Sequence, residues 1–185
     1  MTKRGQWFAV GAVLLAIGGL LGAGLALSGD LAPVSVGSEA PDFRAVDLAT
    51  GDSAGLAEYQ GEVVLLNIWA TWCAPCEQEM PSMERLHQEL GAQGIKVVAV
   101  SVDEGDAEGV RRWAAERQLS FRILQDRTRG IERIYQTTGV PESFVIDSHG
   151  VIVKKVIGAA EWDHPAQKAL FRRLLAERDR VKGGG

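Results

Sequence analysis

The feature that most constrains this chain is a pair of cysteines placed between an apolar strand and a helix. Residues 63–69 form a β-branched, apolar run interrupted only by Asn67, which predicts a buried strand. Cys73 and Cys76 follow within a few residues, and residues 80–90 then carry apolar side chains at helical spacing. The sequence therefore predicts that the two cysteines lie at the beginning of a helix.

This position predicts redox chemistry for the cysteines. The N-terminus of a helix presents unpaired N–H groups and the positive end of the helix dipole, and both stabilise the thiolate that attacks a disulfide. We expect Cys73 to be the exposed attacking thiol and Cys76, one turn further in, to resolve the mixed disulfide and release the substrate. Pro75 is tolerated in the first helical turn. No cofactor is expected beyond a redox-active Cys73–Cys76 disulfide, and two thiols alone cannot complete a four-ligand zinc site.

Other interpretations of the cysteine pair are weaker. A purely structural disulfide would close too short a loop to stabilise the chain much. Two buried cysteines can also be neighbours by chance, but the strand and helix that flank this pair argue against it. A peroxidase with one reactive thiol is a further alternative, although Thr71 stands two residues before Cys73 rather than three.

The N-terminus predicts a membrane anchor. Lys3 and Arg4 precede residues 7–27, an uncharged and mostly apolar segment long enough for the roughly 20 residues that span a bilayer. The positive-inside rule then predicts a single-pass protein of the cell membrane with a cytoplasmic N-terminus and an extracytoplasmic catalytic domain. A cleaved signal peptide is the alternative, because Ala26 and Ser28 have the small-x-small spacing of a cleavage site.

The rest of the chain predicts one α/β domain. We expect a cytoplasmic N-terminus and transmembrane helix over 1–29, a linker over 30–40, the domain over 41–180 and a flexible tail over 181–185. Alternating strand and helix patterns predict a mixed central sheet flanked by helices. Beyond the cysteine segment, the expected elements are a hairpin around residues 50–52, strands at 97–102, 121–124, 143–147 and 151–157, and helices at 106–118, 131–137 and 162–181.

Charge excludes one class of partner. The chain has 20 basic and 24 acidic residues and a net charge of −4. The basic residues are scattered and form no sustained stripe, which argues against nucleic acid as a partner.

Three segments make the chain resemble the thioredoxin superfamily: Ala40-Pro41-Asp42-Phe43, residues 64–76 with their Trp-Cys-Ala-Pro-Cys sequence, and residues 139–147, Gly-Val-Pro-Glu-Ser-Phe-Val-Ile-Asp. The likeness covers about residues 36–175. It is greatest to the TlpA-like branch, which includes the membrane-anchored thiol-disulfide oxidoreductases of the ResA and CcmG type. The resemblance implies a thioredoxin fold with an N-terminal β-hairpin extension.

The resemblance also implies roles for individual residues. Pro141 matches the family's cis-proline beside the disulfide, and the backbone of Val140 would pair with an extended substrate. The substrate would also meet Trp72, Ala74 and Pro75 around the disulfide and Glu142 after the proline. For Pro141 an ordinary trans proline remains the alternative, and for Glu142 a glutamate with no part in the site.

Two further positions concern proton transfer. Asn67 departs from the buried aspartate that classical thioredoxins carry at the matching strand position, and an amide cannot replace it in moving a proton. Glu79 resembles an acidic residue of the maturation reductases and lies on the same helix face as Cys76. A carboxylate there would raise the pKa of the thiol. The alternative is a solvated glutamate on the helix surface.

These residues favour a reductase of protein disulfides. The resemblance implies a protein substrate, for example apocytochrome c during cytochrome c maturation, and a membrane electron donor of the thiol-disulfide relay type. A disulfide oxidase or isomerase is one alternative. A thioredoxin-fold module that binds a partner, with secondary redox activity, is the other.

Overall fold

The computed structural model describes residues 13–19, 22 and 33–183, which divide into two compact units after Pro33. The larger unit contains a seven-stranded sheet in the order β2-β1-β5-β4-β3-β6-β7. Its strands are β1 (Ala45–Asp47), β2 (Ser53–Ala54), β3 (Val63–Trp69), β4 (Ile95–Ser101), β5 (Arg122–Gln125), β6 (Glu142–Ile146) and β7 (Ile152–Ile157). The helices are η2 (Leu56–Tyr59), α2 (Ala74–Leu90), η3 (Gly91–Gln93), α3 (Ala107–Glu116), α4 (Gly130–Ile134) and α5 (Pro165–Gly183).

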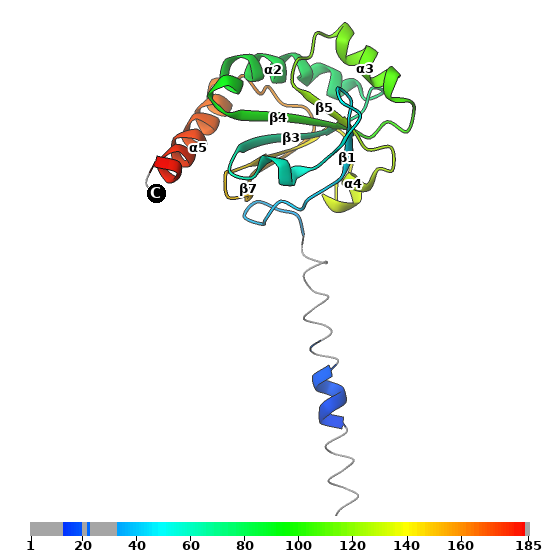
Figure 1. Cartoon of the computed structure of the whole chain (residues 1–185), viewed down its shortest axis with the longest axis vertical. Helices are drawn as coiled ribbons and strands as arrows, with labels where there is room; N and C mark the ends of the chain where they lie inside the picture. The colour runs from blue at the N-terminus through cyan, green and yellow to red at the C-terminus, as the bar shows by residue number, and fades with distance from the viewer. Residues whose placement is uncertain (1–12, 20–21, 23–32, 184–185) are drawn as a thin grey trace, which may run out of the picture. The chain divides into compact units, whose positions relative to one another are not determined.

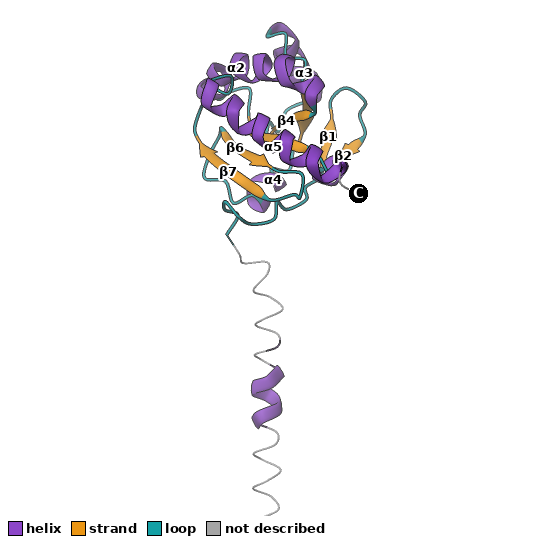
Figure 2. Ribbon diagram, turned by 90° about the vertical axis from the view of Figure 1, so that its left-hand side faces the viewer, coloured by secondary structure: helices purple, strands orange, loops and turns teal. Residues whose placement is uncertain are grey.

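The sheet is mixed, as the sequence predicts. Strands β3, β4 and β5 are parallel, whereas β1, β6 and β7 each pair antiparallel with their neighbours. Helices α2, α3 and α5 lie over one face of the sheet and α4 over the other (Figures 1 and 2). Both parallel crossovers, β3-α2-β4 and β4-α3-β5, move toward the same edge of the sheet, so right-handed crossovers place their helices on the same face.

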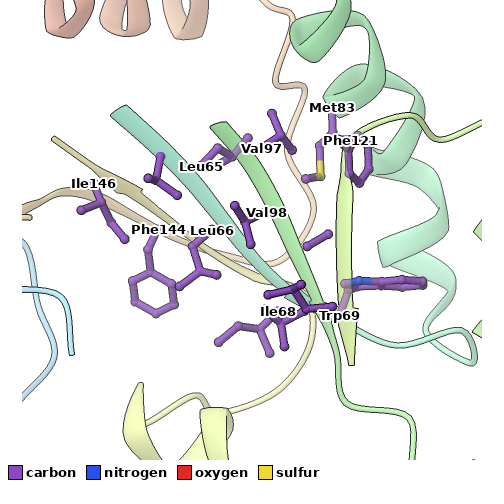
Figure 3. Close-up of a cluster of buried hydrophobic side chains, with 14 of the residues drawn as sticks. Leu65, Leu66, Ile68, Trp69, Met83, Val97, Val98, Phe121, Phe144 and Ile146 are labelled. Carbon is purple, nitrogen blue, oxygen red and sulfur yellow. The ribbon is translucent and has the colours of Figure 1, made fainter. Parts of the chain in front are cut away.

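The core forms on both faces of β3, all seven residues of which are buried. Alternate side chains of a strand point to opposite faces. Trp69 therefore lies on the same side as Met83 of α2, whereas Leu66 lies with Phe144 on the opposite side (Figure 3). On that opposite side the ring of Tyr135, directly after α4, lies 4.8 Å from the ring of Phe144. Burying one large apolar side chain of this kind stabilises the fold by about 1.5–3 kcal/mol.

The domain begins earlier than the sequence predicts. Residues 37–40, assigned to the 30–40 linker, pair with the β7 end of the sheet instead. The amide of Gly37 donates to the carbonyl of Ile152 and that of Ala40 to the carbonyl of Gly150, both at 2.8 Å. Gly37 has a φ of +94°, a conformation that favours glycine and lets the chain turn onto the strand.

The C-terminal helix also differs from its predicted bounds. It begins at Pro165 rather than at Trp162, since proline fits the first turn of a helix. It continues to Gly183, into the segment expected to be a flexible tail.

Strands β1 and β2 pair antiparallel on either side of residues 50–52. Strand β1 also pairs with β5, so this pair is continuous with the central sheet.

The smaller unit is described only in part. Residues 13–19 are helical, and their apolar side chains are solvent-exposed, with Leu15 80% exposed. Among residues 13–19, 22 and 33–183, no helix is both long and apolar enough to cross a membrane. Most of the predicted anchor over residues 7–27 lies outside the described residues.

The turn after α2 gives a test of the fold. Gly94 has a φ of +110°, and a Cβ built on it would lie 2.0 Å from Nη1 of Arg178. The same guanidinium donates to the carbonyl of Gly94 at 3.1 Å and to that of Gln93 at 3.0 Å. We expect Gly94→Ala to lower the free energy of unfolding by more than about 1 kcal/mol, because alanine is strained at this φ.

Urea denaturation of the full chain measures the effect of Gly94→Ala. Gly109→Ala is the matched control, because Gly109 lies inside α3, where alanine is the better helix former and its Cβ meets only an ordinary contact. Equal stability of Gly94→Ala and the parent protein would contradict the role assigned to this turn.

Candidate active site

The two cysteines form a disulfide at the start of α2. Cys73 is the N-cap residue of the helix, and its Sγ accepts the backbone N–H of Cys76 at 3.2 Å. The side chain of Cys73 is 5% exposed and that of Cys76 is fully buried. Cys73 is thus the sulfur nearer to solvent, in agreement with the order of attack that the sequence predicts.

A proline loop faces the disulfide from the other side. The Val140–Pro141 peptide bond is cis, as the resemblance implies, and Pro141 is buried. The carbonyl oxygen of Val140 lies 3.4 Å from Sγ of Cys73. In the dithiol state this carbonyl can accept a hydrogen bond from the Cys73 thiol. The carbonyl of Pro141 accepts the amide of Gly158 at 2.8 Å, which fixes the loop to the end of β7.

The surface beside Cys73 is open. Trp72 is 64% exposed, and Ala74 and Pro75 are exposed in the first turn of α2. These three residues therefore surround the more accessible sulfur, where a protein substrate would contact them.

A buried carboxylate that the sequence analysis missed holds the turn before Cys73. Asp103 accepts the amide of Thr71 at 2.9 Å and also the hydroxyl of the same residue. The hydroxyl of Ser101 donates to the same carboxylate at 2.7 Å. Asp103 follows β4, the parallel neighbour of β3, and the carboxyl ends of parallel strands meet at one edge of a sheet. That topological signal was present in the sequence.

Glu79 is buried, so the solvated alternative is wrong. Its side chain is 1% exposed and accepts three hydrogen bonds: from Nδ2 of Asn67 at 2.7 Å, from Nε1 of Trp162 at 3.1 Å and from the amide of Ala160 at 3.1 Å. Burial raises the pKa of the Glu79 carboxyl, and the three hydrogen bonds oppose that rise.

The raised pKa of Glu79 makes the stability of the fold depend on pH, and its carboxylate also lies near the thiol of Cys76 along the helix. Its folded pKa lies above the unfolded one, so the folded state binds the proton more tightly, and this contribution to stability is lost as the pH rises through the folded pKa. Glu79 also stands three residues after Cys76 on the buried face of α2. Two negative charges on one buried helix face repel one another, so we expect an ionised Glu79 to disfavour a thiolate at Cys76.

Trp162 belongs to this cluster, although the sequence assigned it to the last helix. It lies in the loop before α5, and its amide donates to Oγ of Ser82 at 3.0 Å. The same Nδ2 of Asn67 that bonds Glu79 also donates to Oγ of Ser143, at 2.9 Å. Trp162 and Glu79 are 83 residues apart, and no local pattern in the sequence joins them.

Glu142 is not placed as the resemblance implies. Its side chain is fully buried, and its Oε1 lies 2.8 Å from Nζ of Lys155. Its Oε2 accepts the amide of Thr138 at 3.2 Å. This burial argues against the expected contact with substrate.

A disulfide between the N-cap and first turn of a helix, behind a buried strand and facing a cis-proline loop, defines a thiol-disulfide exchange site of the thioredoxin type. The sequence comparisons agree with this class. Residues 36–155 match the model of the AhpC/TSA family. The chain belongs to this thioredoxin-like family, and its close relatives are named thiol-disulfide oxidoreductases.

Three comparisons show the extent of the likeness. The thiol-disulfide oxidoreductase ResA of Bacillus cereus is 36% identical over 129 residues, which cover 70% of this chain and 73% of the relative. ResA of Geobacillus kaustophilus is 39% identical over 125 residues, covering 68% and 71%. A crystal structure of a thiol:disulfide interchange protein designated DsbE, from Chlorobium tepidum, has a TM-score of 0.69 at 30% identity and covers 77% of this chain and 99% of its own. The thioredoxin fold and the oxidoreductase activity implied by the sequence are thereby confirmed.

The first test of the site concerns the order of attack. With Cys76→Ser, a mixed disulfide with substrate should accumulate on Cys73, because the thiol that would resolve it is gone. Mass spectrometry after an acid quench identifies the modified residue. Faster native alkylation of Cys76 than of Cys73 in the reduced parent protein would reverse the assignment.

The second test concerns Glu79. Glu79→Gln should lower the pKa of the nearer thiol, most directly Cys76, because the carboxylate that opposes its ionisation is removed. A shift of one unit corresponds to about 1.4 kcal/mol, which a thiolate absorbance titration resolves. Glu77→Gln is the matched control: Glu77 lies on the same helix but is exposed and paired with Arg117. Identical titrations of Glu79→Gln and the parent would show that Glu79 does not act on the thiols.

Proposed function

We propose that this oxidoreductase is a membrane-anchored reductase of protein disulfides that works outside the cytoplasm. Its substrate class is a secreted or membrane-attached protein with a disulfide between nearby cysteines, for example apocytochrome c during cytochrome c maturation. The electrons come from a membrane thiol-disulfide relay. In each cycle the Cys73 thiolate attacks the substrate disulfide, and Cys76 then attacks the mixed disulfide, leaving the substrate as a dithiol and the Cys73–Cys76 pair oxidised.

The buried Glu79 is the observation that carries the reductase assignment. Strong stabilisation of the thiolates favours the reduced dithiol over the disulfide, so the disulfide is then a strong oxidant. Glu79 acts in the opposite sense, because its charge disfavours a thiolate at Cys76. A destabilised thiolate makes the dithiol a better electron donor. The relatives named ResA are thiol-disulfide oxidoreductases, and this name specifies no direction of electron flow.

Two features support the membrane location. Lys3 and Arg4 precede the apolar segment, and the described part of that segment, residues 13–19, is helical with exposed apolar side chains. Compartments outside the cytoplasm are oxidising, so a dithiol stays reduced there only if a dedicated donor supplies it with electrons. An anchor would hold the domain next to a donor in the membrane.

The direction of electron flow is tested by the equilibrium reduction potential. The full chain in detergent is equilibrated with glutathione or thioredoxin buffers, and the fraction of Cys73–Cys76 disulfide is measured. We expect a potential well below about −200 mV, in the range of reductants. A potential near about −120 mV would identify a strong oxidant and contradict the assignment in favour of an oxidase or isomerase.

The location is tested by fractionation. The intact chain should remain in the membrane pellet after a high-salt wash, because an apolar span is not released by salt. Protease added outside spheroplasts should digest the domain. A shortened chain in the soluble fraction would favour a cleaved signal peptide, and a domain protected from the protease would contradict the topology.

A further inference from the structure

The strand that follows the cis-proline sends its side chains to both faces of the sheet. Ser143 points toward α2, where its Oγ meets Asn67. Its neighbour Glu142 therefore points to the opposite face, where it meets Lys155 of β7. The two residues thus act on opposite sides of the sheet, and the carboxylate of Glu142 lies away from the Glu79 cluster.

The buried carboxylate of Glu142 forms an ion pair with Lys155. Its carboxylate is fully buried, with Nζ of Lys155 at 2.8 Å. An ionised carboxylate is costly to bury unless it is paired and hydrogen-bonded. The same ammonium lies 3.4 Å from the carbonyl of Val34 and 5.2 Å from the ring centre of Phe144. Lys155 therefore contacts both Glu142 and Val34, the first residue of the larger unit.

The second oxygen of Glu142 holds the loop that faces the disulfide. Oε2 accepts the amide of Thr138 at 3.2 Å. At the other end of the loop, the carbonyl of Pro141 accepts the amide of Gly158 at 2.8 Å. The carbonyl of Val140, between these two anchors, lies 3.4 Å from Sγ of Cys73. The backbone beside the sulfur is thus fixed at both ends.

We propose that Glu142 and Lys155 are a positioning pair that holds the backbone of Val140 in place for a peptide substrate. This inference rests on the proposed attack of Cys73 on a protein disulfide. In that step one S–S bond forms at Cys73 as the substrate S–S bond breaks, and the leaving thiolate takes a proton from water. A peptide substrate needs the Val140 backbone to align its disulfide, whereas a small disulfide without a peptide chain does not.

The test compares two substrates. The reduced full chain reacts with a peptide that contains one disulfide and with hydroxyethyl disulfide, and the ratio of the two second-order rate constants is measured. In Lys155→Met the rate with the peptide should fall about tenfold more than the rate with hydroxyethyl disulfide, since misplaced positioning groups cost rate only where the substrate uses them. Lys154→Met is the matched control: Lys154 is the neighbour on β7 and bonds Gln167 instead, so its ratio should match the parent.

A pair of double variants keeps the test independent of folding. Glu142→Ala/Lys155→Met and Glu142→Gln/Lys155→Met both lack the buried charge, but only the second retains an oxygen that can accept the amide of Thr138. The ratio should fall in the alanine variant and recover in the glutamine variant. An equal ratio in the two double variants, or equal losses with both substrates in Lys155→Met, would overturn the proposal. Failure of the proposed function is distinguishable, because Cys76→Ser would then trap no mixed disulfide on Cys73 in the parent background.

Discussion

A carboxylate removed from water must find hydrogen-bond donors in the fold, and in this protein the donors of Glu79 come from distant parts of the chain. Asn67 donates from β3, while Ala160 and Trp162 donate from the loop before α5. One side chain of α2 is therefore bound both to the central strand and to the segment that closes the domain. The three bonds thus connect α2, the helix that carries Cys76, to both segments. An unsatisfied buried carboxylate would cost several times what one ordinary hydrogen bond contributes.

The same arrangement makes the two sulfurs unequal. Cys73, at the N-cap, receives the N–H of Cys76 and the favourable end of the helix dipole, both of which stabilise a thiolate. Cys76 is fully buried and shares its helix face with Glu79, and we expect both features to disfavour a thiolate there. The carbonyl of Val140 lies beside Cys73, where it can accept a hydrogen bond from the protonated thiol. A sulfur nearer to solvent that attacks first and a fully buried one that attacks it afterwards are what attack followed by resolution requires.

The sequence predicted those parts of the site that depend on local order. The strand, the cysteine pair and the helix follow one another within residues 63–90, so local patterns identified them, and the resemblance supplied Pro141. Whether Glu79 is solvated, where Trp162 lies and which way Glu142 points all depend on partners far along the chain. The amphipathic pattern over residues 162–181 predicts a helical Trp162, yet its indole bonds a residue 83 positions away. The position of Glu142 next to Pro141 predicts contact with the substrate, but strand alternation turns its side chain to the face of the sheet away from α2. The domain begins before the predicted residue 41, because the backbone of residues 37–40 pairs with residues near 150.

We propose that the buried carboxyl of Glu79 is coupled to the thiol of Cys76. Carbon-13 NMR of the Glu79 side chain, recorded across pH in the reduced full chain, tests it most directly. We expect a main transition above the ordinary glutamate range, and a second, smaller change when the thiols ionise, because interacting groups titrate together. A single transition in the ordinary range, with no response to the thiols, would contradict this coupling.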